Sequence, residues 1–326
     1  MNFRCLIPSL LVFLLVSISC LRAQNENQLT QNDILAMVEE LSNWGRWGVD
    51  DQLGAINLIT PQKRKEAAKL VQLGISVSLA RNIETELAAD NPNPFQHKML
   101  SDGQNLHAQW CSDNFSVSYH GFAHSHIDSL FHYVHEQTLY NGISAKVVTP
   151  EGAKKLDVYN LKNGVFTRGI LLDGPALKGV DYLEPGTAIY PSDLDAWEKK
   201  VGVKIASGDV VLIYTGRWAR REVVGPWNGT QAGLHATSAR WLRERDISVL
   251  GSDGGSEVSP SGIPGVNSPI HLLMLHSMGD HMLDNLDLEE LSQKAKELKR
   301  WDFLITFAPL AVEGGTGSPL NPMAIF

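Results

Sequence analysis

Apolar and polar residues follow two periodic patterns along the chain, one typical of helices and one typical of strands. Apolar positions at helical spacing follow Thr30 and Asp33, which form a capping pattern. Thr60 and Pro61 begin a second helix, which glycine ends near Gly74. Beyond these helices, short apolar runs typical of buried strands alternate with amphipathic segments. The predicted strands are 75–80, 168–172, 209–214, 247–250 and 303–307, and the further predicted helices are 192–201, 236–245, 269–278 and 288–298.

This order of elements predicts an α/β fold in which helices flank a mostly buried, mixed β-sheet. We expect one domain over residues 24–326. Residues 88–106 carry Pro92, Pro94 and Gly103, so we expect a long loop there at the border of a pocket. The glycines at 314–317 are followed by prolines and not by a helix, which disfavours a phosphate-binding loop.

The first 23 residues have the pattern of a secretory signal peptide. Arg4 precedes an apolar run from Leu6 to Cys20, and cleavage is expected after Ala23. The run is shorter than the ~20 residues of a spanning helix. We therefore expect an exported protein, periplasmic or secreted, with no membrane association once the signal is removed. Acylation at Cys20 is the alternative; Ser19 favours it, and Ser17, in place of a larger aliphatic residue, disfavours it.

Composition and charge narrow the class of protein. The chain has 326 residues, of which 43% are hydrophobic and 20% are charged, which is enough to build a sizeable core. Cys111 is the one cysteine left after signal removal, so no internal disulfide is expected. The formal net charge of −8 becomes more negative when Arg4 and Arg22 leave with the signal. Such a surface repels nucleic acid and anionic lipid, so the expected partner is a small molecule.

One short stretch between Tyr119 and His132 carries most of the candidate chemistry. Its ionisable residues all stand at even positions, and in an extended chain even spacing directs side chains to one face. Any single histidine in this stretch is more often a hydrogen-bonded side chain near a strand end. The apolar residues between the ionisable ones, however, favour a buried group of ionisable side chains. Imidazole and carboxylate ligands without thiolate suit zinc, manganese or iron. These candidates are His120, His124, His126, Asp128 and His132.

A second cluster lies near the C-terminus. His271 and His276 cannot both face one ion from a regular helix, because five positions turn the helix well past one face, so at least one is a spectator. Asp280 follows a glycine and is expected to be a turn residue. Residues 252–255 follow a predicted strand, at the edge where active sites of open α/β sheets lie. The ionisable residues of this cluster are His271, His276, Asp280, His281 and Asp284.

A family resemblance rests on the first cluster and on segments that occur in the family's order. The stretch AHSHIDSLFH resembles the HxGTHxDxPxH signature of the cyclase-like metal-dependent hydrolases, the family of bacterial kynurenine formamidase and isatin hydrolase. It matches the signature at His126, Asp128 and His132. The resemblance implies a cyclase-like swivelling β/β/α fold. The other similar segments are 47–61, 168–173, 208–218, 251–255 and 314–326.

The resemblance also implies roles for individual residues. His126 and Asp128 match metal ligands of the family, and His132 matches its general acid/base. From the second cluster, His271 matches a further ligand, and Asp284 stands where the family has a glutamate. The resemblance implies one or two divalent ions, zinc or manganese, and a homo-oligomer.

One position departs from the family pattern. Phe122 stands where the family has its first histidine, and a phenyl ring cannot bind a metal. His124 occupies the usual glycine, and His120 lies two residues before Phe122. Either His120 or His124 is therefore expected to supply the missing nitrogen ligand.

These features together predict a metal-dependent hydrolase that opens an amide, N-formyl or lactam C–N bond in a small, aromatic substrate. Four aromatic residues are candidates for the wall of its pocket, although each is more often an ordinary core or rim residue. Two alternatives remain: a lactone or ester hydrolase of the same family, and an exported protein that binds a metal or small ligand without chemistry. The aromatic candidates are Trp44, Trp47, Phe95 and Trp110.

Overall fold

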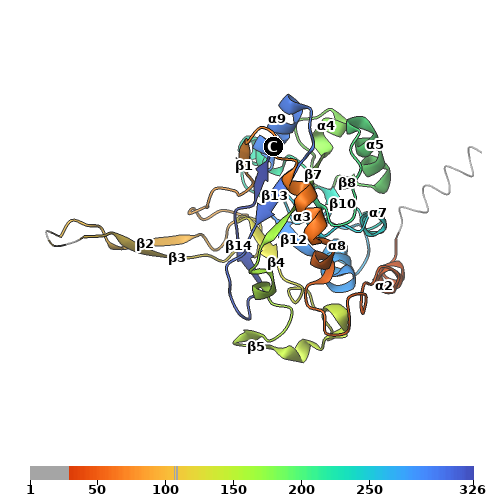
Figure 1. Ribbon diagram of the computed structural model, residues 1–326, viewed down its shortest axis with the longest axis horizontal. Coiled ribbons are helices and arrows are strands. Elements are labelled where there is room, and N and C mark those ends of the chain that lie inside the picture. Colours follow the sequence, from red (N-terminus) through yellow and green to blue (C-terminus); the bar gives the residue numbers. More distant parts are fainter. Residues whose placement is uncertain (1–28, 106, 108) are drawn as a thin grey trace, which may run out of the picture.

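A nine-stranded mixed β-sheet runs through the centre of the molecule (Figure 1). The computed structural model describes residues 29–326 except 106 and 108, so the expected signal peptide, with Cys5 and Cys20, lies outside the described residues. Four parallel strands form the middle of the sheet: β7 (Val165–Asp173), β9 (Val210–Tyr214), β11 (Val249–Ser252) and β12 (His281–Asp284). Their residues are buried almost throughout, as expected of parallel strands covered on both faces.

Antiparallel strands extend this sheet on both sides. Beyond β7 the sheet continues through β13, β15 and β1, and beyond β12 it continues through β4 to β14 at the other edge. The bounds are β1 (Ser76–Ser78), β4 (His126–Asp128), β13 (Asp302–Phe307), β14 (Gly317–Pro319) and β15 (Met323–Ile325).

The sheet is strongly curled. Strand β14 is the last in the strand order and β15 is the second, yet only residues 320–322 separate them in sequence. An extended chain spans at most about 3.5 Å per residue. The two ends of the sheet must therefore approach each other, so that the sheet approaches a closed barrel.

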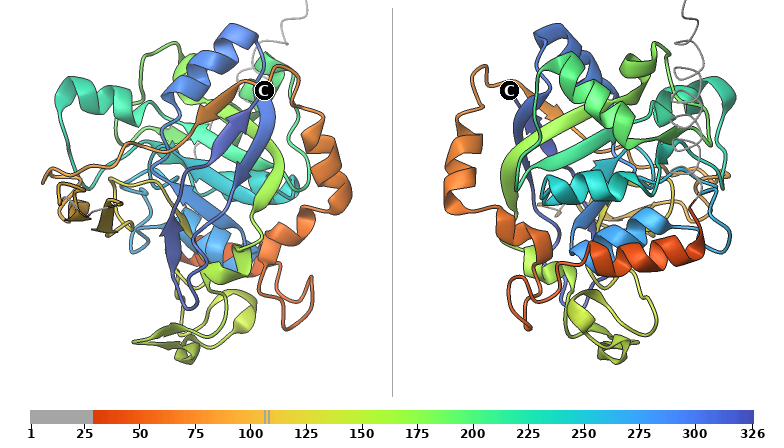
Figure 2. Two further views of the ribbon diagram at one scale, coloured as in Figure 1. Left: turned by 60° about the vertical axis from the view of Figure 1, so that its left-hand side comes forward. Right: turned by 90° about the vertical axis from the view of Figure 1, so that its right-hand side faces the viewer.

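Helices cover both faces of the sheet and form two hydrophobic cores. One core contains buried residues of α2, α5, α7 and the π-helix η5, and Figure 2 shows α2 beside η5. The other contains residues of η1, η4 and α9. The bounds are α2 (Gln31–Glu40), α5 (Pro191–Val201), α7 (Ser238–Glu244), η5 (Leu272–Met278), η1 (Gly54–Leu58), η4 (Val158–Leu161) and α9 (Glu289–Leu298).

The remaining elements connect these layers. Helix α3 (Pro61–Ala68) packs along β7, and α4 (Gly174–Lys178), α6 (Arg217–Val224) and α8 (Pro269–His271) are short. Besides η1 and η4, two further short 3-10 helices are η2 (Tyr140–Gly142) and η3 (Ala145–Val147). Three two-stranded sheets pair β8 (Ala188–Ile189) with β10 (Gly233–Leu234), β5 (Val148–Thr149) with β6 (Gly152–Ala153), and β2 (Gln96–Ser101) with β3 (Ser112–Ser116).

The predicted fold class is confirmed, since flanking helices cover a mixed sheet. The capping pattern at Thr30 and Asp33 begins α2, where each residue's side chain accepts from the other's backbone N–H. The prediction of a loop over residues 88–106 is wrong in part, because 96–101 form strand β2. The predicted helix 269–278 is one turn of α-helix followed by a π-helix, which ends at Gly279 in the left-handed conformation. Among the described residues, no helix combines the length and the apolarity that crossing a membrane requires.

Candidate metal centre

Strand β4 brings two ionisable side chains to one face of the sheet. His126 and Asp128 are separated by one residue, so the pleat directs both the same way. Asp284 of β12 stands directly opposite His126 in the antiparallel pair. One ligand atom from each of these three buried residues lies within 4.8 Å of the others. A spacing of two in a strand thus gives the geometry that the sequence predicts for this pair.

His120 and His132 reach the same carboxylate from the turns on either side of β4. His120 Nδ1 lies 3.1 Å from Asp128 Oδ1, and His132 Nε2 lies 3.9 Å from Oδ2. The two imidazole rings stack with their centroids 4.1 Å apart. Each ring is 30% exposed, so these two histidines form the open side of the cluster.

The prediction of one extended strand over the whole histidine stretch is wrong. Strand β4 has three residues, and bends occupy residues 120–124. Gly121 has φ 140°, a conformation that side-chain-bearing residues rarely adopt, and it turns the chain beside His120. His120 and His132 therefore owe their positions to turns and not to even spacing.

His271 approaches from the opposite direction, at the end of α8. Its Nε2 lies 3.4 Å from Asp284 Oδ2 and 3.7 Å from Asp128 Oδ2. Its Nδ1 lies 2.7 Å from Glu257 Oε1, while Glu257 Oε2 accepts the backbone N–H groups of Ile270 and His271. Glu257 thus fixes both the ring and the backbone of His271. Sequence reasoning missed Glu257; the signal available was its position two residues after the strand-end segment 252–255.

Neighbouring groups fix which ring nitrogen faces the cluster. His126 Nδ1 donates to the carbonyl oxygen of His124 at 2.8 Å, which leaves Nε2 at 3.4 Å from Asp128 Oδ1. His120 Nε2 contacts Thr316 Oγ1 at 2.7 Å, which leaves Nδ1 toward Asp128. Such anchoring of the outer nitrogen is typical of metal-binding histidines.

The cluster holds polar atoms that no group among the described residues satisfies. The atoms Asp128 Oδ1, Asp128 Oδ2, Asp284 Oδ1 and His120 Nδ1 are buried without a hydrogen-bond partner. A buried, unpaired polar group costs a few kcal/mol, so native structures rarely gather several in one place without a ligand. Two carboxylates with several imidazoles form a nitrogen and oxygen donor set, which fits a divalent cation such as zinc or manganese.

The charges of the cluster are strongly shifted from their ordinary states. Burial raises the pKa of Asp128, but the His120 and His126 imidazoles outweigh burial and hold this pKa well below its usual range. Burial lowers the pKa of His271, but the carboxylates of Glu257 and Asp284 outweigh it and raise this pKa well above its usual range. For His132, burial is the largest influence and lowers the pKa, so its imidazole is neutral at pH 7.

His124 does not join the cluster. It belongs to neither ligand-bearing group, its carbonyl supports His126, and its buried ring nitrogens have no hydrogen-bond partner among the described residues. The expectation that His124 faces the same way as its neighbours is therefore wrong, because the bend before β4 breaks the alternation. Of the two candidates for the missing nitrogen, His120 is the one near Asp128. The Phe122 ring lies instead by the Arg217 guanidinium, 5.6 Å from its carbon.

The second cluster divides as expected, although a π-helix and not a regular α-helix joins its two histidines. His271 reaches the centre, whereas His276 points away and its Nε2 contacts Thr138 Oγ1 at 3.1 Å. His281 Nδ1 donates to the backbone carbonyl of Asp128, which supports the residue without contacting its carboxylate. Asp280 is buried, and burial raises its pKa well above the usual range.

The predicted aromatic wall does not gather around the centre. Trp44 packs against His276, Arg46 lies over Trp47, and Phe95 stacks on Phe115 at 5.4 Å; Trp110 is 73% exposed. Tyr119, which sequence reasoning missed, lies closer, with its ring 4.5 Å from that of His120.

Comparison with known proteins gives a consistent result. The sequence model of the Cyclase family matches residues 56–257, a range that includes His120 to His132 and Glu257. A crystal structure described as a novel cyclase is 28% identical to this chain, with a TM-score of 0.80. The match covers 87% of this chain and 99% of that one. No curated protein sequence matches this chain.

Two isatin hydrolases have the same fold. Isatin hydrolase A from Ralstonia solanacearum is 22% identical, with a TM-score of 0.55, over 77% of this chain and 91% of its own. Isatin hydrolase A from Labrenzia aggregata, bound to benzyl benzoate, is 19% identical, with the same TM-score of 0.55, over 79% and 94%. At these sequence identities, the comparison shows that this chain and the isatin hydrolases share a fold.

Proposed function

The chain belongs to the cyclase family, and we propose that it is an exported metal-dependent hydrolase that opens an amide, N-formyl or lactam C–N bond in a small, aromatic substrate. The observation that carries this proposal is the convergence of Asp128, Asp284 and four imidazoles on a few buried oxygen and nitrogen atoms that lack partners among the described residues. The imidazole nitrogens lie 3.1 to 3.9 Å from the Asp128 oxygens, yet none of these contacts is a well-aligned hydrogen bond among the described residues. Such an arrangement suits a cation that both kinds of donor can face.

In this proposal, His120, His126, Asp128, His271 and Asp284 hold one or two divalent ions, zinc or manganese. When bound, such a cation provides Lewis acidity, which makes water a hydroxide source near neutral pH and polarises a carbonyl. The chain keeps the donors in position without the ion: Thr316 fixes His120, the His124 carbonyl fixes His126, and Glu257 fixes His271.

His132 is the proposed general acid/base. It stands on the open side of the cluster, stacked on His120 and 3.9 Å from Asp128, close enough to reach a water that lies against that carboxylate. Its neutral Nε2 accepts a proton from the attacking water and returns it to the leaving nitrogen as the C–N bond breaks. The nearby carboxylate of Asp128 favours the imidazolium that exists between these two steps.

The isatin hydrolases of similar fold support a lactam or related amide as the substrate. The ring of Tyr119, beside His120, suits a flat, aromatic molecule. A lactone or ester hydrolase is the second candidate, because His132 would act in the same way toward an oxygen leaving group. An exported protein that binds the ion or a small ligand without turnover needs the same ligands but no His132.

The deciding experiment measures metal content and turnover together. Protein treated with a chelator should lose hydrolysis of a panel of aryl amides, N-formyl anilines, lactams and lactones, and zinc or manganese should restore it. His132→Ala should keep the metal and slow turnover ~100-fold or more. His97→Ala, which removes an exposed histidine far from the centre, is the matched control. Full turnover by metal-free protein contradicts the proposal, and binding without any turnover identifies the non-catalytic alternative.

A further inference from the structure

A cavity of about 510 Å³ lies between helix α2, the π-helix η5 and the turn at residues 135–138. Figure 2 shows α2 and η5 side by side. The volume falls within the ~300–1,000 Å³ of pockets that hold small molecules. The described residues that line this cavity include none of the proposed metal ligands and not His132. The cavity is therefore a candidate binding site of its own.

Trp44 forms an aromatic wall of the cavity and is fixed from behind. Its side-chain N–H donates to the backbone carbonyl of His276 at 2.7 Å. Its ring meets the His276 ring edge to face, with centroids 5.1 Å apart, and a Cβ added at Gly142 would lie 3.4 Å from it. The side chain nevertheless remains 39% exposed. An aromatic ring that is held in one position and still open to solvent is pre-organised to contact a bound molecule.

His276, on the same cavity, has a buried nitrogen without a partner. Burial lowers the pKa of this imidazole to about 4, and His135 lowers it further, so the ring is neutral at pH 7 and has one N–H. The Thr138 hydroxyl donates to the carbonyl of His135 at 2.7 Å, so in its 3.1 Å contact with His276 Nε2 the ring is the donor. Nδ1 is then an acceptor, and it has no hydrogen-bond partner among the described residues. A hydrogen-bond donor bound in the cavity would satisfy it.

The ionisable groups at the cavity favour a positive charge. Glu39 of α2 and Glu136 of the turn line it, and neither forms an ion pair with a described residue. Glu40, the neighbour of Glu39, is by contrast paired with Arg240 at 2.8 Å. No lysine or arginine is among the described residues of the lining. Two carboxylates and an acceptor nitrogen attract a cation and repel an anion.

The turn that carries Glu136 has an unusual backbone. Glu136 has φ 46° and Gln137 has φ 60°, both in the left-handed region, while His135 and Thr138 exchange backbone hydrogen bonds at 3.0 and 2.8 Å. Two-residue turns with this conformation normally carry asparagine and glycine. Glutamate and glutamine adopt it at a cost in free energy, which is typical of backbone held in place at functional sites. The strained turn keeps Glu136 at the cavity.

We propose that this cavity binds a small organic cation, a primary ammonium on a flat, apolar body. The ammonium lies by the carboxylates of Glu39 and Glu136 and donates to His276 Nδ1. The apolar body packs on the ring of Trp44 and on Leu35, and the ring also attracts the cation through its π face. This site is distinct from the metal centre and does not depend on the proposed hydrolysis.

Calorimetric titration of the protein with 2-phenylethylammonium tests the site. We expect saturable binding with a stoichiometry of one. The matched anion, 3-phenylpropionate, has the same ring and the same chain length, and it should bind at least about 10-fold more weakly. The experiment measures binding and not turnover, so its failure leaves the proposed function untouched. Absence of saturable binding by the amine, or equal binding of the two probes, overturns the proposal.

Two variants test whether the amine lies in this cavity. Glu136→Gln removes a carboxylate at constant size, and Trp44→Leu removes the aromatic wall, and each should raise the dissociation constant about 10-fold. Glu244→Gln on α7 and Trp110→Leu, both at exposed positions outside the cavity, are the matched controls and should leave the dissociation constant unchanged. Amine binding that either cavity variant leaves intact overturns the proposal.

The metal state separates this cavity from the metal centre. Chelator-treated protein and zinc-loaded protein should bind 2-phenylethylammonium with the same dissociation constant, because the described lining holds none of the proposed ligands. Amine binding that appears only in the zinc-loaded protein would mean that the amine occupies the metal centre, and it would overturn the proposal.

Discussion

Two buried aspartates show how differently this chain treats the same side chain. Asp209, at the amino end of β9, is fully buried and accepts hydrogen bonds from Arg168, Lys63 and the backbone N–H of Ala206. Asp128, in β4, is equally buried, yet neither of its oxygens has a hydrogen-bond partner among the described residues. Around it stand imidazoles, which can each present a lone pair as easily as a proton.

The two aspartates therefore have different roles: Asp209 stabilises the fold, whereas Asp128 is positioned to bind a ligand. Asp209 is neutralised by cations of the chain itself, so its position stabilises the folded state. Asp128 is surrounded by groups whose positions are fixed from behind, by Thr316, Glu257 and the His124 carbonyl. The fold therefore supplies the energy to hold the proposed donors in place, and the ion completes them. Variants at the two aspartates should fail in opposite ways.

The largest effect is expected at Asp128. Asp128→Asn removes the carboxylate on which the cluster converges, so the protein should lose its metal, and turnover should fall by at least about 1,000-fold. The free energy of unfolding of the metal-free protein should fall less than it does for Asp209→Asn, because the groups that face Asp128 are imidazoles, which can lose their protons, and not an arginine and a lysine. Elemental analysis and chemical denaturation measure the two quantities. An Asp128→Asn protein that retains metal contradicts the assignment.

At Asp209 the expectation is reversed. Asp209→Asn leaves Arg168 and Lys63 without their counter-ion, and the free energy of unfolding should fall by about 3 kcal/mol. Metal content should stay at the wild-type level. Asp50→Asn, at a largely exposed position, is the matched control and should change neither. If Asp209→Asn lost metal at unchanged stability, the contrast between the two aspartates would not hold.

A smaller effect is expected at Glu257, which acts through His271. Glu257→Gln keeps the size of the side chain but removes its charge, so metal affinity should fall by about 10 to 100-fold. The free energy of unfolding of the metal-free protein should fall as well, because the buried contact between Glu257 and His271 loses its negative charge. Competition with a chromogenic chelator measures the affinity, and Glu297→Gln on the exposed side of α9 is the control. An unchanged affinity would show that the contact with His271 has no part in binding.

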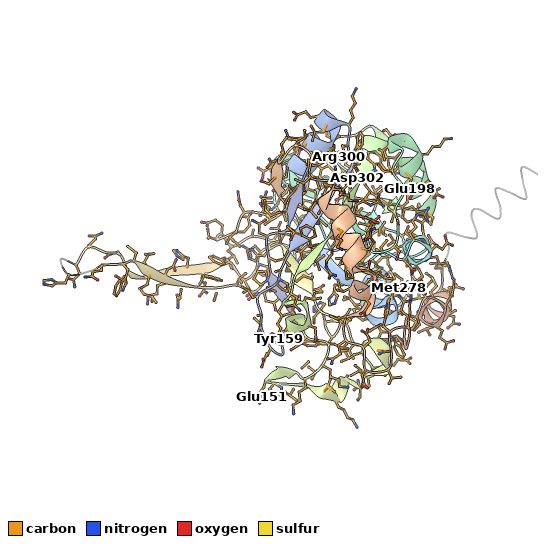
Figure 3. The ribbon with its side chains drawn as sticks, in the orientation of Figure 1. Glu151, Tyr159, Glu198, Met278, Arg300 and Asp302 are labelled. Carbon is orange, nitrogen blue, oxygen red and sulfur yellow. The ribbon has the colours of Figure 1, made fainter. Side chains whose placement is uncertain are left out.

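A further contrast with Asp128 is Glu198, a carboxylate whose hydrogen-bond partners should make the stability of the protein depend on pH. Figure 3 labels Glu198, which accepts from Arg245, Lys204 and the backbone N–H of Ile205. Burial raises the pKa of Glu198, but these donors outweigh it and lower the pKa from 4.5 to about 2. Its stabilisation is therefore complete above about pH 4.5 and is lost as the pH falls towards 2. In Glu198→Gln, unfolding should depend less on pH in that window; equal slopes would contradict the pairing.

The smallest effect is expected at His124. Its ring lies outside the cluster, and its contribution is a backbone carbonyl that any residue supplies. His124→Gln should therefore leave metal content and turnover unchanged within about two-fold, whereas His120→Gln should lower metal affinity by about 10-fold or more. The same elemental analysis serves both variants. Equal losses would mean that both histidines bind.

The parts of the centre that the sequence predicts are those that a local rule determines. The pairing of His126 with Asp128 follows from the alternation of side chains in a strand. His271 and His276 are separated as expected, but the rule behind that expectation does not apply, because a π-helix and not a regular α-helix joins them. The choice between His120 and His124 follows no local rule, because it depends on the turn at Gly121 and on Thr316, nearly two hundred residues away. The role of Glu257 could not be predicted from the sequence for the same reason, since only the fold brings it next to His271.

The fold shows the same limit. Strands buried on both faces, such as β9 and β13, are predicted from their continuous apolar runs. Strand β2, QHKMLS, has neither such a run nor an alternation, and the prolines and glycine around it predict a loop. The π-helix over 272–278 has no periodic signature either, because all seven of its residues are buried. A sequence pattern shows which side of an element packs against the core. It gives no signal where an element contacts no core, as in β2, or where all of its sides are buried, as in the π-helix.

The curled sheet has a consequence for the order in which the protein matures. Segment 316–325 anchors His120 through Thr316, pairs β14 with β4, and then places β15 beside β13. A ribosome makes this segment after every other residue that it joins. Until this segment is in place, a growing chain therefore lacks the hydroxyl that fixes His120 and the strand that pairs with β4, however much of the parallel sheet has already formed. In the proposed centre, the orientation of His120 would thus be fixed only after this segment has joined the sheet.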